Sequence, residues 1–198
     1  RMTKAKLAEV DLTHADLSGA NLTGAELNAT LLEGADLSRA NLTEAILTDA
    51  NLKNAFLIGA NLQKADLQGV NLEGADMAGV KLRHASLKNA NLKQVDLRRA
   101  DLEHADFSKA NLSSANFTGA KMSEGLFIGA DLTGTNMDSA DITDTQFKGA
   151  IGFNQDCVGH CAASIERKDV LWIVAYLGIN ICWFCSHVGS SGVLVFLV

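Results

Sequence analysis

Apolar residues recur at every fifth position along most of this 198-residue chain. From residue 2 to residue 147, every position whose number ends in 2 or 7 holds Leu, Phe, Met or Ile, and 21 of these thirty positions hold Leu. Every position ending in 0 or 5 holds a small or β-branched residue, and 22 of those thirty are Ala. No insertion shifts the phase of this pattern, of which Ala15-Asp16-Leu17-Ser18-Gly19 is one copy.

A period of five residues excludes the two simplest secondary structures. On an α-helix, residues five apart are separated by about 500°, so the apolar positions would spread around the helix. On a continuous strand, they would change faces with each repeat. The pattern fits a short extended side followed by a turn, with the Ala and the Leu two positions later both pointing inward. Self-similarity at a fixed period indicates a solenoid, in which each unit buries its apolar residues against its neighbours.

The polar positions of the repeat support turns at the corners. Positions ending in 4 or 9 include eleven Gly, which provide the positive φ that type II turns need. The position before each large apolar residue is Asp or Asn in 19 of thirty copies, and we expect these side chains to bond to the local backbone. Acid–base catalysis by paired carboxylates would need a pocket, which a filled interior does not offer. We therefore expect that the protein is not an enzyme.

The motif Ala-(Asp/Asn)-Leu-X-X resembles that of the pentapeptide-repeat family, with about thirty copies over residues 1–150. The resemblance implies an all-β solenoid: a right-handed quadrilateral β-helix in which four repeats form each 20-residue coil. We assign residues 1–151 to this β-helix and residues 152–198 to a hydrophobic, Cys-containing tail. The residue before the first full repeat, Arg1, is already in phase, so we expect further sequence upstream.

A 20-residue coil places residues n and n+20 in one column along the solenoid, which predicts side-chain contacts between coils. Phe107, Phe127 and Phe147 should stack inside it at about 4.8 Å, the strand spacing. Three further columns are expected on the outside: Asn51, Asn71, Asn91 and Asn111 as an amide ladder, Lys81, Asp101, Lys121 and Asp141 with alternating charge, and the pair His84 and His104.

Some outward positions hold apolar residues in place of polar ones: Leu31, Ile46, Phe56, Ile58, Leu126 and Ile128. Ile46, Phe56 and Ile58 share one coil and are the candidate partner-binding residues. The alternative is scattered surface apolar residues, which are normal. No third ligand type converges on His84 and His104, so solvated turn residues are expected there, with no metal bound in the repeat region.

The whole chain has a net charge of −6, and the four sides of the expected solenoid carry net charges of 0, −1, −2 and −2 over residues 1–150. A basic belt surrounds one coil, with only Asp96 opposing it within that coil: Lys81, Arg83, Lys88, Lys93, Arg98 and Arg99. The belt is too short and too mixed in charge to predict nucleic-acid binding. We predict a non-enzymatic structural or protein-interaction scaffold with an unknown protein partner. The alternative, implied by family members that protect DNA gyrase, is a DNA-mimicking, gyrase-interacting protein.

The composition changes at about residue 152, beyond which lie both Trp, the only Tyr and all four Cys. A helix is expected over 165–185, with Ser164 as its N-cap. Because 170–198 contains no Asp, Glu, Lys or Arg, three interpretations stay open: a membrane anchor, a helix that caps the solenoid, or sequence that did not evolve with the repeat. The expected localisation is accordingly cytoplasmic or membrane-associated.

The four cysteines of the tail are weak candidates for a zinc site: Cys157, Cys161, Cys182 and Cys185. Their spacings fall within the range of structural zinc sites, but the second pair lies in an apolar run. A disulfide and free buried thiols are the alternatives. No cofactor is predicted.

Overall fold

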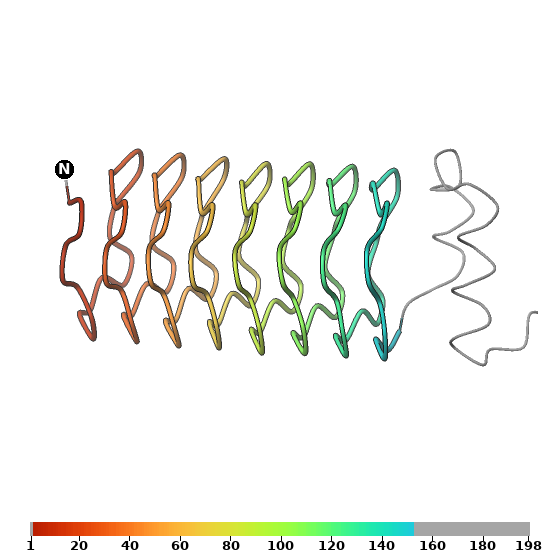
Figure 1. Ribbon diagram of the computed structural model, residues 1–198. Helices are drawn as coiled ribbons and strands as arrows, with labels where there is room; N and C mark the ends of the chain where they lie inside the picture. Colours follow the sequence, from red (N-terminus) through yellow and green to blue (C-terminus); the bar gives the residue numbers. More distant parts are fainter. Residues whose placement is uncertain (1, 153–198) are drawn as a thin grey trace, which may run out of the picture. The chain divides into compact units, whose positions relative to one another are not determined.

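The computed structural model describes residues 2–152, which form a stack of coils with a period of 20 residues (Figure 1). Neighbouring coils are joined by parallel single-residue bridges at every fifth position, from Lys6 with Glu26 to Asp131 with Ile151. Every bridge joins a residue to the one 20 positions later. Within 2–152, the chain contains no helix and no strand longer than one bridge residue. The bridges confirm the predicted coil of four repeats.

Backbone hydrogen bonds hold each coil to both of its neighbours. The N–H of Leu22 donates to the carbonyl of Asn41 in the next coil at 2.7 Å, and the N–H of Asn41 donates back to the carbonyl of Ala20 at 2.8 Å. Within the coil, the N–H of Ala25 donates to the carbonyl of Leu22 at 2.9 Å and closes a turn. This repeating pattern gives the backbone its partners without a long strand, as buried peptide groups require.

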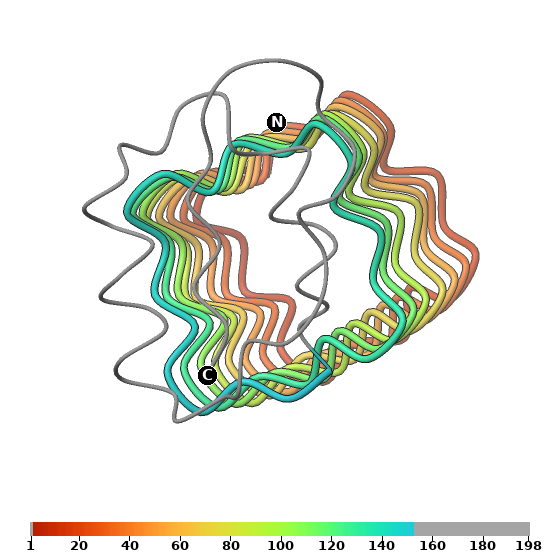
Figure 2. The ribbon, with the colours of Figure 1, turned by 90° about the vertical axis from the view of Figure 1, so that its right-hand side faces the viewer.

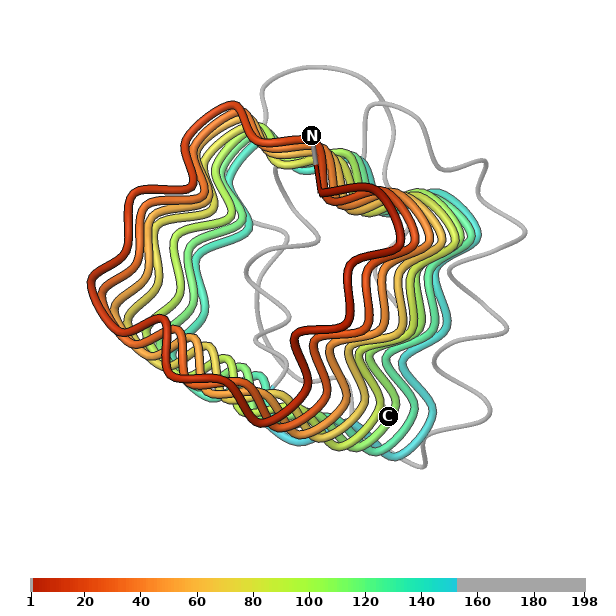
Figure 3. The same cartoon turned by 90° about the vertical axis from the view of Figure 1, so that its left-hand side faces the viewer.

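The end-on views show a four-sided outline, with each coil lying over the one before (Figures 2 and 3). Each side collects one repeat from every coil. The first side contains 21–25, 41–45 and 61–65, the second 26–30, 46–50 and 66–70, the third 31–35, 51–55 and 71–75, and the fourth 36–40, 56–60 and 76–80, all continuing in steps of 20. The second and fourth sides are opposite each other, because they are two repeats apart in a coil of four.

The core is the interior of the stack, filled by the large and small positions of the repeat from Leu22 to Ala140. The predicted phenylalanine stack is present. The ring centroids of Phe107 and Phe127 lie 4.8 Å apart, and those of Phe127 and Phe147 lie 5.5 Å apart. A Cβ on Gly125 would lie 3.1 Å from the Phe127 ring and 2.8 Å from the carbonyl oxygen of Met122, so glycine makes room for the ring.

Every position ending in 4 or 9, from Lys4 to Gly149, has a positive φ. The eleven glycines at these positions have the predicted positive φ, and so do the other nineteen residues, which are not glycine. None of the nineteen is β-branched, which agrees with the steric cost of such side chains in the left-handed region. The turn geometry therefore follows from the stacking of the coils, and glycine is one of several residues that accept it.

The predicted corner role of Asp and Asn is confirmed at all nineteen positions before a large apolar residue. In each case Oδ1 accepts a hydrogen bond from the backbone N–H two residues later, as Asp36 does from Ser38 at 2.8 Å. We call this contact the corner bond. It fixes the entry into the turn and occupies one oxygen of each side chain.

Of two predicted outer columns, the amide ladder forms side-chain contacts between Asn51, Asn71 and Asn91. Within residues 2–152 the charged column forms no ion pair between its own members. In the amide ladder, Asn71 Nδ2 donates to Asn51 Oδ1 at 3.1 Å, and Asn91 Nδ2 donates to Asn71 Oδ1 at 3.0 Å. In the charged column, Asp101 is bridged to Lys81 through the backbone, but its carboxylate is paired with Arg83 Nε at 3.1 Å. The long Arg side chain reaches the carboxylate diagonally between coils.

The predictions for the tail lie outside the described residues. They comprise the helix over 165–185, the hydrophobic stretch 170–198 and the candidate ligands Cys157, Cys161, Cys182 and Cys185. Among residues 2–152, no helix is long and apolar enough to cross a membrane.

Candidate functional site

Two exposed apolar side chains, Phe56 and Ile58, lie close together on the fourth side. Phe56 is 48% exposed and Ile58 is 44% exposed, in a stack whose outward positions are mostly polar. The intervening residue, Leu57, points inward and is fully buried. Phe56 and Ile58 are therefore two exposed apolar residues, two positions apart in the sequence, on the same side of the stack.

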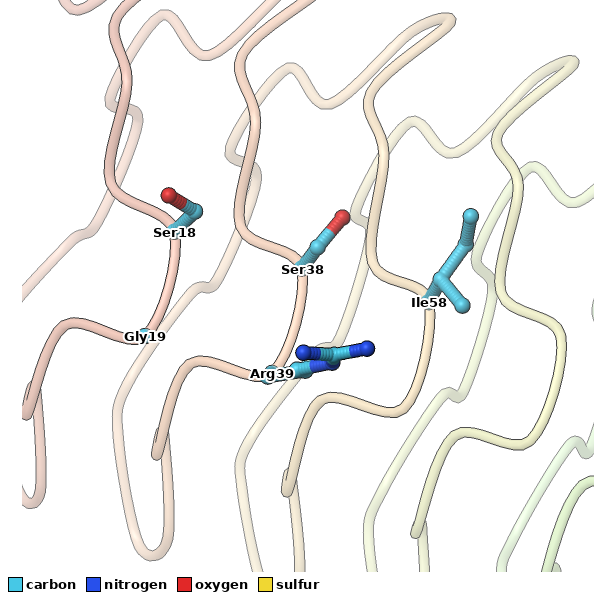
Figure 4. Close-up of a pocket in the computed structure, with 5 residues that line it drawn as sticks. All are labelled: Ser18, Gly19, Ser38, Arg39 and Ile58. Carbon is cyan, nitrogen blue, oxygen red and sulfur yellow. The ribbon is translucent and has the colours of Figure 1, made fainter.

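A shallow hollow of about 460 Å³ lies against Ile58 (Figure 4). It is lined by Ser18, Gly19, Ser38, Arg39 and Ile58, which come from three successive coils of the fourth side. Serine and glycine leave the space open because their side chains are small. Sequence reasoning missed these lining residues, although the 20-residue columns through Ile58 would have identified the two serines.

The structure does not bring together the three predicted partner-binding residues. Ile46 is bridged to Glu26 and Asp66 on the second side, while Phe56 lies on the fourth. A separation of ten residues is half a coil, so Ile46 and Phe56 face opposite directions. The candidate surface thus contains Phe56 and Ile58, and Ile46 is a separate exposed residue.

Carboxylates flank Phe56 along the axis of the stack. Phe56 is bridged to Asp36 in the preceding coil and to Asp76 in the next, and Asp16 is bridged in turn to Asp36. In all three carboxylates Oδ1 is occupied by a corner bond. The hydroxyl and the backbone N–H of Ser18 donate to Asp16 and lower its pKa. Within residues 2–152, none of the three has a basic side chain within ion-pair distance.

Phe56 occupies a position at which a polar residue would stabilise the corner. Its column neighbours Asp36 and Asp76 each make a corner bond there. Phe56 has no side-chain oxygen that could accept a hydrogen bond from the backbone N–H of Ile58. Its aromatic ring is also exposed to water. Neither feature favours the stability of the fold, which is the usual pattern for a residue retained for binding.

Three of the six cations of the basic belt form ion pairs, two of them with acids of the next coil and one with Asp96 of the same coil. Arg83 pairs with Asp101 and Glu103. Lys88 Nζ lies 3.1 Å from Asp106, and Arg98 lies 2.6 Å from Asp96. The remaining cations of the belt, Lys81, Lys93 and Arg99, belong to three different sides, so they do not form one basic surface.

The histidine column is stacked as predicted. The imidazoles of His84 and His104 lie 4.7 Å apart with an angle of 5° between their planes, and His104 Nδ1 is 3.4 Å from a carboxylate oxygen of Glu124. In the part of the chain that the structure describes, no group of three or more potential ligands could hold a metal ion. The column is therefore a surface contact between coils.

Comparison with known proteins identifies the repeat. The family described as pentapeptide repeats matches overlapping stretches that run from 1–39 to 115–151. No curated protein matches the sequence. Among solved structures, HetL from the cyanobacterium Nostoc sp. strain PCC 7120, a pentapeptide repeat protein involved in heterocyst differentiation regulation, is 35% identical with a TM-score of 0.52. The match covers 75% of this chain and 73% of HetL.

Two further structures have lower TM-scores. The pentapeptide repeat protein alr5209, also from Nostoc, is 32% identical with a TM-score of 0.45 over 60% of this chain and 81% of its own. QnrB1, a plasmid-mediated fluoroquinolone resistance protein, is 20% identical with a TM-score of 0.45 over 92% of each chain.

Proposed function

Because this chain belongs to the pentapeptide-repeat family, we propose that it is a non-enzymatic scaffold that binds a protein partner on its fourth side, around Phe56 and Ile58. The scaffold is the right-handed quadrilateral β-helix that the family resemblance implies. Each coil is hydrogen-bonded to the next, so each side of the β-helix presents its side chains to a partner at a regular spacing.

The observation that carries the proposal is the exposed pair at a position where stability favours Asp or Asn. Phe56 gives up the corner bond that both column neighbours make, and Ile58 adds a second exposed apolar side chain beside a hollow. Aromatic residues are enriched at the centre of protein interfaces because they bury a large area with few rotatable bonds. The exposed Phe56, two residues from the Ile58 that lines the hollow, has the character of such an anchor.

The chemistry of the described residues supports a binding role over a catalytic one. The interior is filled by apolar side chains, and each Asp or Asn at the corner positions has one oxygen occupied by the backbone. The hollow is lined by two serines, a glycine, an arginine and an isoleucine, without a histidine or carboxylate to act as a base.

The alternative is a DNA-mimicking protein that acts on gyrase, as the family resemblance allowed. A duplex mimic needs one continuous acidic face, and here Arg83, Lys88 and Arg98 pair with acids around the middle of the stack. We therefore expect the full chain to have no effect in a gyrase supercoiling assay with a fluoroquinolone. Protection of gyrase in that assay would favour the alternative.

The binding proposal is tested with two matched substitutions, Phe56→Asn and Ile46→Asn. Both introduce the residue type that the repeat prefers, so both restore a corner bond. Each should increase the free energy of unfolding by about 0.5–1.5 kcal/mol, which raises the denaturation midpoint. The full chain is immobilised on a resin and incubated with a lysate of its source organism. The unmodified chain and Ile46→Asn should retain a partner protein that Phe56→Asn does not retain. Equal retention by the two variants would contradict the proposal.

A further inference from the structure

The fourth side combines its apolar pair with a column of carboxylates, and this combination indicates the chemistry of the partner. Over 16–80 this side contains three acids, Asp16, Asp36 and Asp76, and one cation, Arg39. The acids and Phe56 occupy one edge of the side, at the Asp/Asn position of the motif. Arg39 lies at the opposite corner, where its Cγ would be 3.9 Å from a Cβ on Gly59. The hollow lies at the edge that contains Arg39, because its lining residues are Ser18, Gly19, Ser38, Arg39 and Ile58 (Figure 4).

The acids retain the capacity to bind an external cation. Asp36 and Asp76 each use Oδ1 to accept one backbone N–H, which leaves Oδ2 for another donor. By contrast Asp96, the next residue in the column, is paired with Arg98 at 2.6 Å. Arg98 also interacts electrostatically with Asp76, without forming an ion pair with it. The stretch without an ion pair therefore runs from Asp16 through Asp36 and Phe56 to Asp76, and Asp16 and Asp36 are its most open acids.

The spacing of this column matches an α-helix laid along the stack. With coils about 4.8 Å apart, Asp36 and Asp76 are separated by about 9.6 Å, with Phe56 midway. Residues seven apart on a helix are about 10.5 Å apart on one face, with residue i+3 or i+4 between them. In an extended strand, same-face residues four apart are about 13 Å apart, which overshoots the column. A helix about 10 Å wide also suits a side that is one repeat across.

Resting on the proposed function, we propose that the partner presents a basic amphipathic helix, which lies on the fourth side along the column of acids and Phe56, parallel to the axis of the stack. Successive turns of one helix face present a cation to Asp16, a cation to Asp36, an apolar residue to Phe56 and a cation to Asp76. A further apolar residue contacts Ile58. The carboxylates select the charge of the helix, and the apolar pair anchors its centre.

The test uses the full chain and a synthetic alanine-based helix with lysine, lysine, leucine and lysine on successive turns of one face. Two control peptides have the same length: one moves the lysines to the face opposite the leucine, and the other replaces them with glutamate. Binding of the fluorescently labelled peptides is followed by anisotropy at low and high salt. We expect only the first peptide to bind, with an affinity that falls as salt rises.

Substitutions on the protein locate the binding site. Asp36→Asn and Asp76→Asn remove a charge while keeping the corner bond, and each should weaken the first peptide several-fold, about 2- to 5-fold. Phe56→Asn should weaken it by about tenfold or more. Ile46→Asn on the opposite side is the control and should bind as the unmodified chain does.

Two results would overturn the inference: equal binding of the lysine peptide and its rearranged control, or no loss of affinity in Phe56→Asn and Asp36→Asn. If these occur while Phe56→Asn still loses the partner captured from lysate, the proposed binding surface stands and the basic helix is wrong. If the lysate partner also persists in Phe56→Asn, the proposed function fails as well.

Discussion

The phenylalanine stack offers a quantitative test of how the coils hold together. Phe127 is fully buried, its ring is stacked on Phe107 at 4.8 Å and on Phe147 at 5.5 Å, and the ring of Phe117 meets it edge-on at 6.1 Å. Phe127→Ala removes all three aromatic contacts at once. Phe147 is only partly buried, so Phe147→Ala removes less buried area.

The expected losses follow from burial. Replacing a buried Phe with Ala costs about 3–5 kcal/mol, and the stacked contacts place Phe127→Ala at the upper end of that range. The cavity cannot collapse easily, because a Gly125 without a side chain borders it and the backbone on each side is bonded to both neighbouring coils. For Phe147→Ala we expect about 1–3 kcal/mol, since its side chain is partly in water.

Guanidinium chloride melts of the full chain, followed by circular dichroism, measure both variants under the same conditions. Phe117→Ala is the matched control, because Phe117 is equally buried but contacts Phe127 only through a ring edge. The expected order of destabilisation is Phe127→Ala, then Phe117→Ala, then Phe147→Ala. A loss at Phe147 equal to or larger than that at Phe127 would refute the stack as a source of stability.

Two further predictions concern the outer columns. Asn71→Asp removes the amide group that donates to Asn51 and places a carboxylate oxygen against the Asn51 oxygen. This substitution should lower the free energy of unfolding, measured in a melt, by about 1–2 kcal/mol. Asn61→Asp, at the same repeat position on another side, is the control and should change it little. Partial burial of Asp106 raises its pKa, but hydrogen bonds from Ser108 and Lys88 lower the pKa by more. The net result is a pKa of Asp106 below its ordinary value. A lowered pKa stabilises the fold above the unfolded-state pKa, near 3.9, and this stabilisation is lost as the pH falls through the folded value. Asp106→Asn should therefore be less stable than the unmodified chain at pH 7, and the two midpoints should converge in acid.

The repeat made much of the fold predictable, because each position of the period has one fixed environment. The interior location of Leu and Ala follows from the five-residue spacing, and the corner bonds follow from short Asp and Asn side chains before the turn. The 20-residue coil came from the family resemblance, since a five-residue spacing does not state how many repeats close a coil. Once the coil is known, the contacts within the columns of Phe127 and Asn71 follow directly.

The candidate site was only partly predictable, for reasons of geometry. Phe56 and Ile46 were grouped because they share a coil, but residues ten apart in a four-sided coil point in opposite directions. The ion pairs of Arg83 were missed because its long side chain reaches acids in the next coil, 18 and 20 residues away. Positive φ at non-glycine residues was missed because the required turn is imposed by stacking and not by local preference.

The most direct test of the proposed binding surface is photo-crosslinking in the cells that make this protein. The photo-reactive amino acid p-benzoylphenylalanine is placed at position 56, which keeps an exposed aromatic side chain, and separately at the exposed position 46 on the opposite side. On illumination, we expect a discrete covalent adduct with a partner protein from position 56 and none from position 46. Adducts of the same size and yield from both positions, or an adduct from position 46 alone, would contradict it.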